Sequence, residues 1–280
     1  MHWESFQRAR RFGSPPLASR LSIYVASVAA SLLILLLILA TALAMAGPIL
    51  IRRRVAFDQL RTNNEVAGFK FATIGVLYAV LLAFVVIIVW ERFHDAEKAL
   101  ADEAGAAATI YHLAGGLGEP SAAALRNHMS AYLTSVLQDD WPAMSRGQWS
   151  PATTRVLSEM YDVLVNYRPA DLHDSDVQQD LLREFDELTR ARRERIVMAE
   201  GTVPDVIWFV VFLGAALTIS FTFLFGTQNV ITQSLMTGVL AALIGSALLV
   251  IIAIDRPFTG SVVVSQQALR AVLEDFRTAP

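Results

Sequence analysis

The sequence contains no cysteine and has few charged residues for its length. Of its 280 residues, 18% are charged, whereas an ordinary soluble domain has about 25%. Without cysteine the chain can form no disulfide, no zinc–thiolate site and no catalytic thiol. The redox compartment stays open, because a chain without thiols is stable in either environment. The composition therefore excludes thiol chemistry and differs from that of an ordinary soluble domain.

Charged residues are missing altogether from four long apolar stretches. These are Leu21–Leu50, Phe71–Trp90, Val206–Phe225 and Leu235–Ile254. A helix needs about 20 apolar residues to cross about 30 Å of hydrocarbon, and a buried soluble helix seldom lacks charge on every face. We therefore predict an all-α protein with four transmembrane helices. The first stretch is longer than the 7–15 apolar residues typical of a cleaved signal peptide, so we expect it to be retained.

The four spans divide the chain into five segments. They are a basic N-terminal segment (1–20), spans one and two (21–90), an acidic segment (91–205), a transmembrane hairpin of spans three and four (206–254) and a C-terminal segment (255–280). The acidic segment has 11 Lys and Arg against 20 Asp and Glu, a net charge of −9. Such a charge argues against nucleic acid as a partner.

Apolar residues in the acidic segment recur at helical spacing, which predicts an extramembrane bundle of about four helices. The first continues the second span, because Glu91–Lys98 contains no Pro or Gly, and apolar or small residues then follow at Phe93, Ala96, Leu100, Ala104, Ala107, Tyr111 and Ala114. This predicts one helix over 69–114, about 70 Å long. The other three are predicted from Pro120 to Asp139-Asp140-Trp141-Pro142, from Ser150 to just before Pro169, and from a Ser175 cap to near Gly201.

The distribution of Lys and Arg bears on orientation. Four spans place both termini and the acidic segment on one side of the membrane. Near the membrane, that side has 12 Lys and Arg and the opposite side has 5. The positive-inside rule then predicts a cytoplasmic bundle, although the triplet Arg52-Arg53-Arg54 directly after the first span favours the reverse.

Tryptophans mark the predicted membrane boundary on the side of the bundle. Trp90 ends the second span and Trp208 begins the third, and indole rings prefer the interface between lipid and water. We expect both to be interface anchors.

Four arginines lie shortly before the third span, namely Arg190, Arg192, Arg193 and Arg195. We expect them to form a basic collar facing lipid headgroups.

The sequence offers no catalytic or metal-binding motif. His94 and His112 share a helical face but lie about 27 Å apart, so they cannot hold one metal within a subunit. Asp102 and Glu103 could bind an ion, but a solvated helix face explains them better. We therefore predict no enzyme activity, no cofactor and no metal site.

Several parts of the sequence resemble the bestrophin-like domain family of bacterial membrane proteins. They are the second span from Gly68 to Phe93, Ala96–Ala114 with Glu103, Asp140-Trp141-Pro142, Arg192-Arg193, and the post-span motif Asp255-Arg256-Pro257-Phe258 with Thr259-Gly260. The resemblance extends over about residues 50–276 in order and spacing. It implies a multi-pass protein of the bacterial inner membrane that associates with itself.

True bestrophins are pentameric ion channels whose second span lines a narrow apolar neck. Carried over to this sequence, the resemblance implies neck rings of Val76, Val80 and Phe84, which lie about 6 Å apart along one helical face. The alternative is that this face packs on neighbouring spans. The calcium-sensing acidic cluster of bestrophins has no residue-by-residue match here, so calcium control is not implied.

Two functions of different classes follow from these observations. The first is an oligomeric channel for inorganic ions in the lipid bilayer, with cations slightly favoured because the bundle is acidic. The second is a non-conducting membrane scaffold or sensor whose helical domain binds a partner protein.

Overall fold

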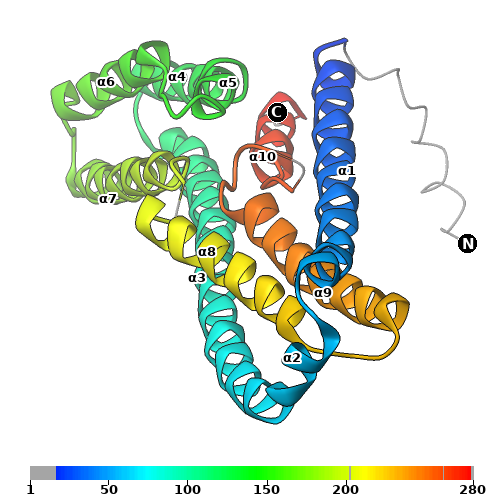
Figure 1. Cartoon of the computed structure of the whole chain (residues 1–280). Helices are drawn as coiled ribbons and strands as arrows, with labels where there is room; N and C mark the ends of the chain where they lie inside the picture. The colour runs from blue at the N-terminus through cyan, green and yellow to red at the C-terminus, as the bar shows by residue number, and fades with distance from the viewer. Residues whose placement is uncertain (1–16, 202, 261, 279–280) are drawn as a thin grey trace, which may run out of the picture.

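The computed structural model describes residues 17–201, 203–260 and 262–278, and this part of the chain consists of helices and the loops between them (Figure 1). In chain order the helices are α1 (Leu17–Arg54), α2 (Phe57–Thr62), α3 (Asn64–Leu113), η1 (Ala114–Gly116), α4 (Ser121–Ser135), η2 (Val136–Asp140), α5 (Trp141–Met144), α6 (Pro151–Asn166), α7 (Leu172–Val197), α8 (Asp205–Phe221), η3 (Thr222–Leu224), α9 (Val230–Ile254) and α10 (Gln267–Thr278). The all-α prediction is confirmed. Arg8, Arg10 and Arg11 of the basic N-terminal segment lie outside the described residues.

Within the described residues, four helical stretches are long and apolar enough to cross a membrane. They are Ser31–Arg54, Asn64–Gly116, Asp205–Leu224 and Val230–Ile254, with mean hydropathies of 2.6, 2.9, 2.2 and 2.6. Only 11% to 33% of the residues in their most apolar windows are buried inside the chain. Their apolar side chains therefore face outwards, an arrangement typical of contact with lipid or with another subunit. The prediction of four apolar spans is confirmed.

The longest helix, α3, connects the spans to the rest of the molecule. It has 50 residues and is about 75 Å long at 1.5 Å per residue. In its first half, Tyr78, Val85 and Val89 are buried in a core shared with α8 and α9. In its second half, Ala96 and Leu100 are buried among other helices. The predicted helix over 69–114 is confirmed and begins five residues earlier, at Asn64.

The second half of α3 shares one hydrophobic core with α4, α6, α7 and α10. Fully buried members of this core include Ile110, Leu125, Met129, Leu133, Met144, Met160, Leu164, Leu181 and Leu188. The C-terminal α10 joins it through Phe276, whose ring stacks on Tyr111 with centroids 3.8 Å apart. The Tyr111 hydroxyl also donates to the carbonyl of Phe276, at 3.3 Å. The C-terminal segment thus adds a helix to the bundle built from residues 91–205.

Two predicted helix boundaries are wrong. Asp139-Asp140-Trp141-Pro142 does not end a helix, because the chain continues through the π-helical turn η2 into α5. Pro142 lies in the first turn of α5, where its missing N–H and fixed φ cost little. α7 begins at Leu172 rather than at a Ser175 cap, since the side chain of Asp171 caps it by accepting a hydrogen bond from the Asp174 N–H at 2.8 Å.

Candidate functional site

The three predicted neck residues lie on one side of α3 and are open to the surroundings of the subunit. Val76, Val80 and Phe84 are 63%, 49% and 62% exposed. The opposite side of the same turns is buried: Val85 is 4% exposed, and the Tyr78 hydroxyl donates to the carbonyl of Val211 on α8 at 3.1 Å. Among the described residues these three side chains are therefore largely uncovered, and packing of this face on neighbouring spans stays the alternative. That it lines a pore stays a prediction.

The two tryptophans differ in their surroundings. Trp90 is 63% exposed at the last turn of the apolar part of α3. Trp208 is half-buried, packs on the core shared by α3, α8 and α9, and stacks on Phe212 with ring centroids 5.5 Å apart. Their role as interface anchors stays a prediction, but Trp208 has an additional packing role that the sequence did not indicate.

Beyond Trp90, a cluster of buried charges joins α3 to the helices around it. The guanidinium of Arg195 on α7 donates through Nε and Nη2 to both carboxylate oxygens of Glu103 on α3. Arg192 donates through Nε to Asp140 Oδ2 at 3.0 Å, and Arg195 Nη2 lies 3.4 Å from the same oxygen. Glu103, Asp140 and Arg195 are 0% exposed and Arg192 is 7% exposed. We call these four residues the charge cluster.

The carboxylates of the charge cluster accept further hydrogen bonds from outside it. The Tyr132 hydroxyl donates to Glu103 Oε1 at 2.5 Å, and the Ser150 N–H donates to Asp140 Oδ1 at 2.8 Å. Burial and the adjacent Glu103 carboxylate raise the pKa of Tyr132 well above its usual value. Burial alone would lower the pKa of Arg195, but the Glu103 carboxylate outweighs it and raises that pKa. The cluster is thus held as paired charges.

The charge cluster overturns two expectations from the sequence. Glu103 does not lie on a solvated face, and Arg192 and Arg195 do not face lipid headgroups; only Arg190 and Arg193 of the four arginines are exposed. The sequence did contain a signal for the burial of Glu103, because this residue is at heptad spacing between Leu100 and Ala107, which are both buried. A charged residue in the apolar register of a helix predicts a buried partner of opposite charge.

The post-span motif connects the end of α9 to the other helices. Asp255 is buried, and its carboxylate accepts a hydrogen bond from the Val203 N–H just before α8, at 2.9 Å. Phe258 is buried and packs edge-on against Trp141, with centroids 5.4 Å apart. The Pro257 carbonyl accepts from the Val264 N–H at 2.8 Å, while Arg256 is exposed. In this geometry the motif ties the spans to the bundle.

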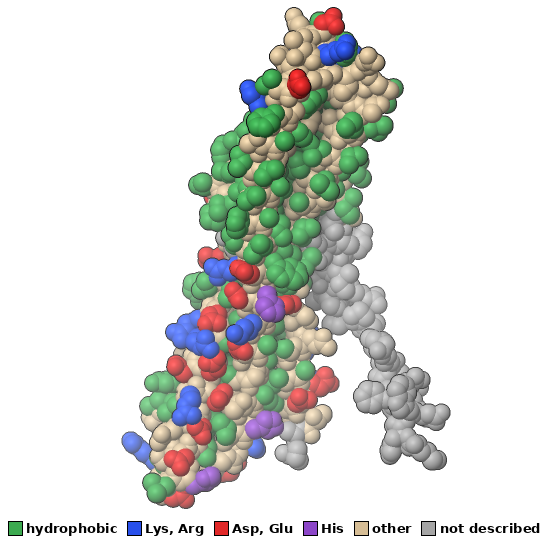
Figure 2. Space-filling view, turned by 90° about the horizontal axis from the view of Figure 1, so that it is seen from below, with side chains coloured by type: hydrophobic (Ala, Val, Ile, Leu, Met, Phe, Trp, Pro, Cys, Tyr) green, Lys and Arg blue, Asp and Glu red, His purple; other side chains and the backbone are tan. Residues whose placement is uncertain are grey.

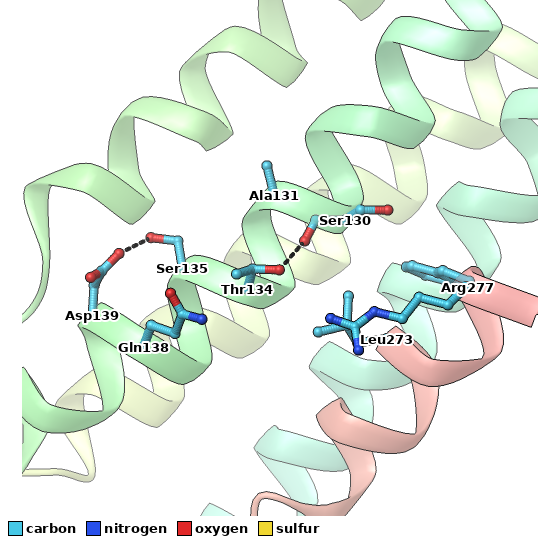
Figure 3. A pocket seen from close by; sticks show the side chains of 9 residues that line it. Ser130, Ala131, Thr134, Ser135, Gln138, Asp139, Leu273 and Arg277 are labelled. Atoms are coloured by element: carbon cyan, nitrogen blue, oxygen red, sulfur yellow. Dashed lines mark hydrogen bonds between the residues drawn. The ribbon is translucent and has the colours of Figure 1, made fainter. Parts of the chain in front are cut away.

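An open groove lies between α4 and α10 and has a volume of about 440 Å³. Figure 3 shows hydroxyl, amide and carboxylate side chains of α4 and η2 on one wall and Leu273 and Arg277 of α10 on the other. The hydroxyls of Ser130 and Thr134 donate to backbone carbonyls one turn earlier in α4. The groove is therefore polar on one wall and mixed on the other, and it opens to the surface.

The described residues contain no group of His, Asp and Glu arranged to hold a metal ion. His94 and His112 lie on the same exposed side of α3, five helical turns apart, as their spacing predicts. The residues of chemical interest are therefore those of the exposed face of α3 and of the charge cluster further along the same helix.

Comparisons with known proteins bear on the family and on the fold. The family described as Bestrophin-like domain matches residues 38–269. A mutant of a bacterial bestrophin homolog from Klebsiella pneumoniae is 13% identical and superposes with a TM-score of 0.67, over 86% of this chain and 98% of that chain. A second structure of that homolog, phased with zinc, is 14% identical with a TM-score of 0.66, over 86% and 97% of the two chains. At these identities the likeness shows the fold. No curated protein matches this chain.

Proposed function

This chain belongs to the Bestrophin-like domain family, and from that premise we propose that it is one subunit of an oligomeric membrane ion channel. The observation that carries the proposal is the apolar face of α3 at Val76, Val80 and Phe84, which the described helices leave exposed. One subunit with four spans has too few helices to enclose a central pore, so a pore requires several copies. Five copies, the number that the resemblance to bestrophins implies, would place five α3 helices around one axis.

In this proposal the segments 21–90 and 206–254 cross the bilayer, and the bundle of 91–205 lies outside it. Trp90 and Trp208 would then lie at one interface, at the depth that indole rings prefer. The bundle would face the cytoplasm from the bacterial inner membrane, because more Lys and Arg flank the membrane on that side. The transported partners are inorganic ions, and the proposal includes no cofactor and no enzymatic step.

Recording currents from the purified full chain in planar bilayers tests the proposal. We expect discrete single-channel currents in potassium chloride, from protein whose mass in detergent corresponds to several copies. A strictly monomeric protein, or an intact oligomer that stays silent when pH and calcium are varied, would contradict channel function.

The neck makes a more specific prediction. Rings of Val76, Val80 and Phe84 would form an apolar constriction that gates by dewetting. Replacing all three with Ala should widen it and raise the single-channel conductance. The matched control replaces Tyr78 with Phe on the buried side of the same helix, which removes a hydrogen bond inside the subunit but changes no exposed side chain. Unchanged conductance in the triple variant, with normal assembly, would place the pore elsewhere.

The second candidate function is a non-conducting scaffold or sensor that binds a partner protein. The observation that favours it is the groove between α4 and α10 (Figure 3), which is open to the surface of the bundle. Silent bilayers together with loss of partner capture in an Arg277→Ala variant would favour this function, and capture unaffected by the substitution would count against the groove.

A further inference from the structure

The exposed face of α3 does not end with the apolar neck. Continuing from Phe84 in steps of three and four residues, it passes through Ile87, Glu91, His94 and Lys98, and all four side chains are exposed. These steps keep residues on one side of a helix. The opposite side stays buried over the same turns, at Val89 and Ala96, which are 0% exposed. One continuous face therefore changes from apolar to ionisable between Ile87 and Glu91.

The change is also visible on the surface of the molecule. On the face seen in Figure 2, a wide hydrophobic band gives way to a zone of mixed acidic, basic and histidine side chains. On α3 itself the first ionisable residue after the neck is Glu91, seven residues and about 10 Å beyond Phe84. Lys98 follows after another seven residues, again about 10 Å.

Among the described residues, neither Glu91 nor Lys98 takes part in an ion pair. His94, between them, has Nδ1 3.5 Å from a carboxylate oxygen of Glu97, which is on a neighbouring side of the helix. Glu91 is thus the fixed charge on this face closest to the neck, and the exposed Asp95 and then Lys98 follow it along α3.

We propose that Glu91 of each subunit forms an acidic ring just beyond the apolar neck, that Lys98 forms a basic ring further along α3, and that the two rings set the preference of the pore for cations or anions in opposite senses. The proposal rests on the channel function proposed above. Repeated copies of one charge around a narrow opening concentrate ions of the opposite sign and repel those of the same sign. The two rings are separated by about one Debye length at 0.1 M salt, so each acts on ions mainly at its own level.

Reversal potentials in a potassium chloride gradient test the two rings separately. Glu91→Gln should lower the ratio of potassium to chloride permeability by about twofold or more, and Lys98→Gln should raise it by a similar factor. Both changes replace an exposed charged side chain with a neutral polar one, so assembly should be unaffected. The matched control is Asp162→Asn, which removes an exposed carboxylate from α6 and should leave the ratio unchanged.

The absence of cysteine from the chain permits a second test on assembled channels. Glu91→Cys introduces a single thiol, and a negatively charged thiosulfonate reagent should restore the permeability ratio while a positively charged one should lower it further. Asp162→Cys, treated in the same way, should not respond.

The outcomes separate this proposal from the proposed function. If wild-type protein conducts but the Glu91 and Lys98 variants keep its reversal potential, the proposal of two charged rings is contradicted and the proposal of channel function is unaffected. A shift as large in Asp162→Asn as in Glu91→Gln would also overturn the rings, because it would assign selectivity to the charge of the whole bundle. An intact wild-type oligomer that passes no ions would overturn both.

Discussion

Glu103 and Arg195 are charged side chains that lie wholly inside the helical bundle. Removing such groups from water costs several kcal/mol per ion, and their mutual attraction repays this only when geometry and hydrogen bonding are good. Here the Arg195 guanidinium meets both oxygens of Glu103, and Tyr132 supplies a further donor. The pair joins α3 to α7, so it fixes how the long helix is held by the bundle.

We expect Arg195→Leu to destabilise the protein by about 3–5 kcal/mol, because it leaves Glu103 buried without its partner. Thermal unfolding of the detergent-solubilised protein measures the effect. The exposed neighbour Arg193 provides the control, since Arg193→Leu removes a charge from the same turn of α7 and should change stability by less than about 0.5 kcal/mol. The double variant Glu103→Leu/Arg195→Leu should recover much of the loss. A melting temperature of Arg195→Leu equal to that of Arg193→Leu would contradict the role assigned to the pair.

Asp174 gives a prediction for acid pH. Its carboxylate accepts hydrogen bonds from the Tyr167 hydroxyl at 2.8 Å and from the Ala170 N–H at 3.1 Å, and these bonds lower its pKa. A carboxyl whose pKa is lower in the folded state contributes stability above its unfolded pKa of about 4, and this contribution is lost as pH falls through the folded value. In Asp174→Asn, the fall in melting temperature between about pH 6 and about pH 3 should therefore be smaller than in the wild type. Asp162→Asn, at an exposed carboxylate, is the control, and an equal fall in all three proteins would contradict the prediction.

For single residues, the sequence predicted which side chains are exposed better than it predicted which charges are buried. Val76, Val80 and Phe84 were expected on one helical face, and the structure places them on one exposed face. The pairing of Glu103 with Arg195 was not predicted, because the two residues are 92 positions apart in the chain. Helical periodicity shows that a charge occupies an apolar position, but only the packing of α3 against α7 shows which partner meets it.

Among the elements, α3 determines the arrangement of the others. Its first half packs on α8 and α9, and its second half packs on α4, α7 and α10. Periodicity and the absence of Pro predicted this helix correctly, since both signals are local. The π-helical turn η2 was missed because Pro142 can either end one helix or begin the next, and local sequence leaves the two nearly equal in energy. The Asp171 cap of α7 was missed for a similar reason, because several polar residues near Ser175 can cap a helix.

A proline at Ala96 should break the continuity of α3. Ala96 is 0% exposed at the point where the apolar part of the helix enters the bundle. Proline removes a backbone donor and clashes with the preceding turn, which costs about 3 kcal/mol or more. We expect Ala96→Pro to lower the melting temperature and to impair assembly measured by mass in detergent. Ala96→Gly retains the backbone donor and should cost only about 1 kcal/mol. Equal melting temperatures of the two variants would show that the backbone hydrogen bond at this position does not matter.

At the scale of the whole molecule, charge and hydrophobicity are segregated. The spans carry exposed apolar side chains, and residues 91–205 carry a net charge of −9. The order of residues along the chain was enough to predict this division, because the division does not depend on their packing. The proposed association of copies would depend in addition on surfaces contributed by different subunits.

The acidic bundle predicts cation preference at the entrance of the proposed oligomer. Several copies, each contributing −9, would surround the entrance with negative charge and raise the local concentration of cations. We therefore expect the reversal potential in a potassium chloride gradient to lie towards the potassium equilibrium value, opposite to the anion preference that resemblance to animal bestrophins would imply.

Lowering the ionic strength from about 0.1 M to about 0.01 M lengthens the Debye length from about 10 Å to about 30 Å, so carboxylates spread over the bundle should then contribute more. A local ring such as Glu91 would change little over the same range, and the salt dependence therefore separates the two sources of selectivity. A reversal potential at the chloride equilibrium value at both ionic strengths would contradict the prediction and assign ion preference to groups other than these carboxylates.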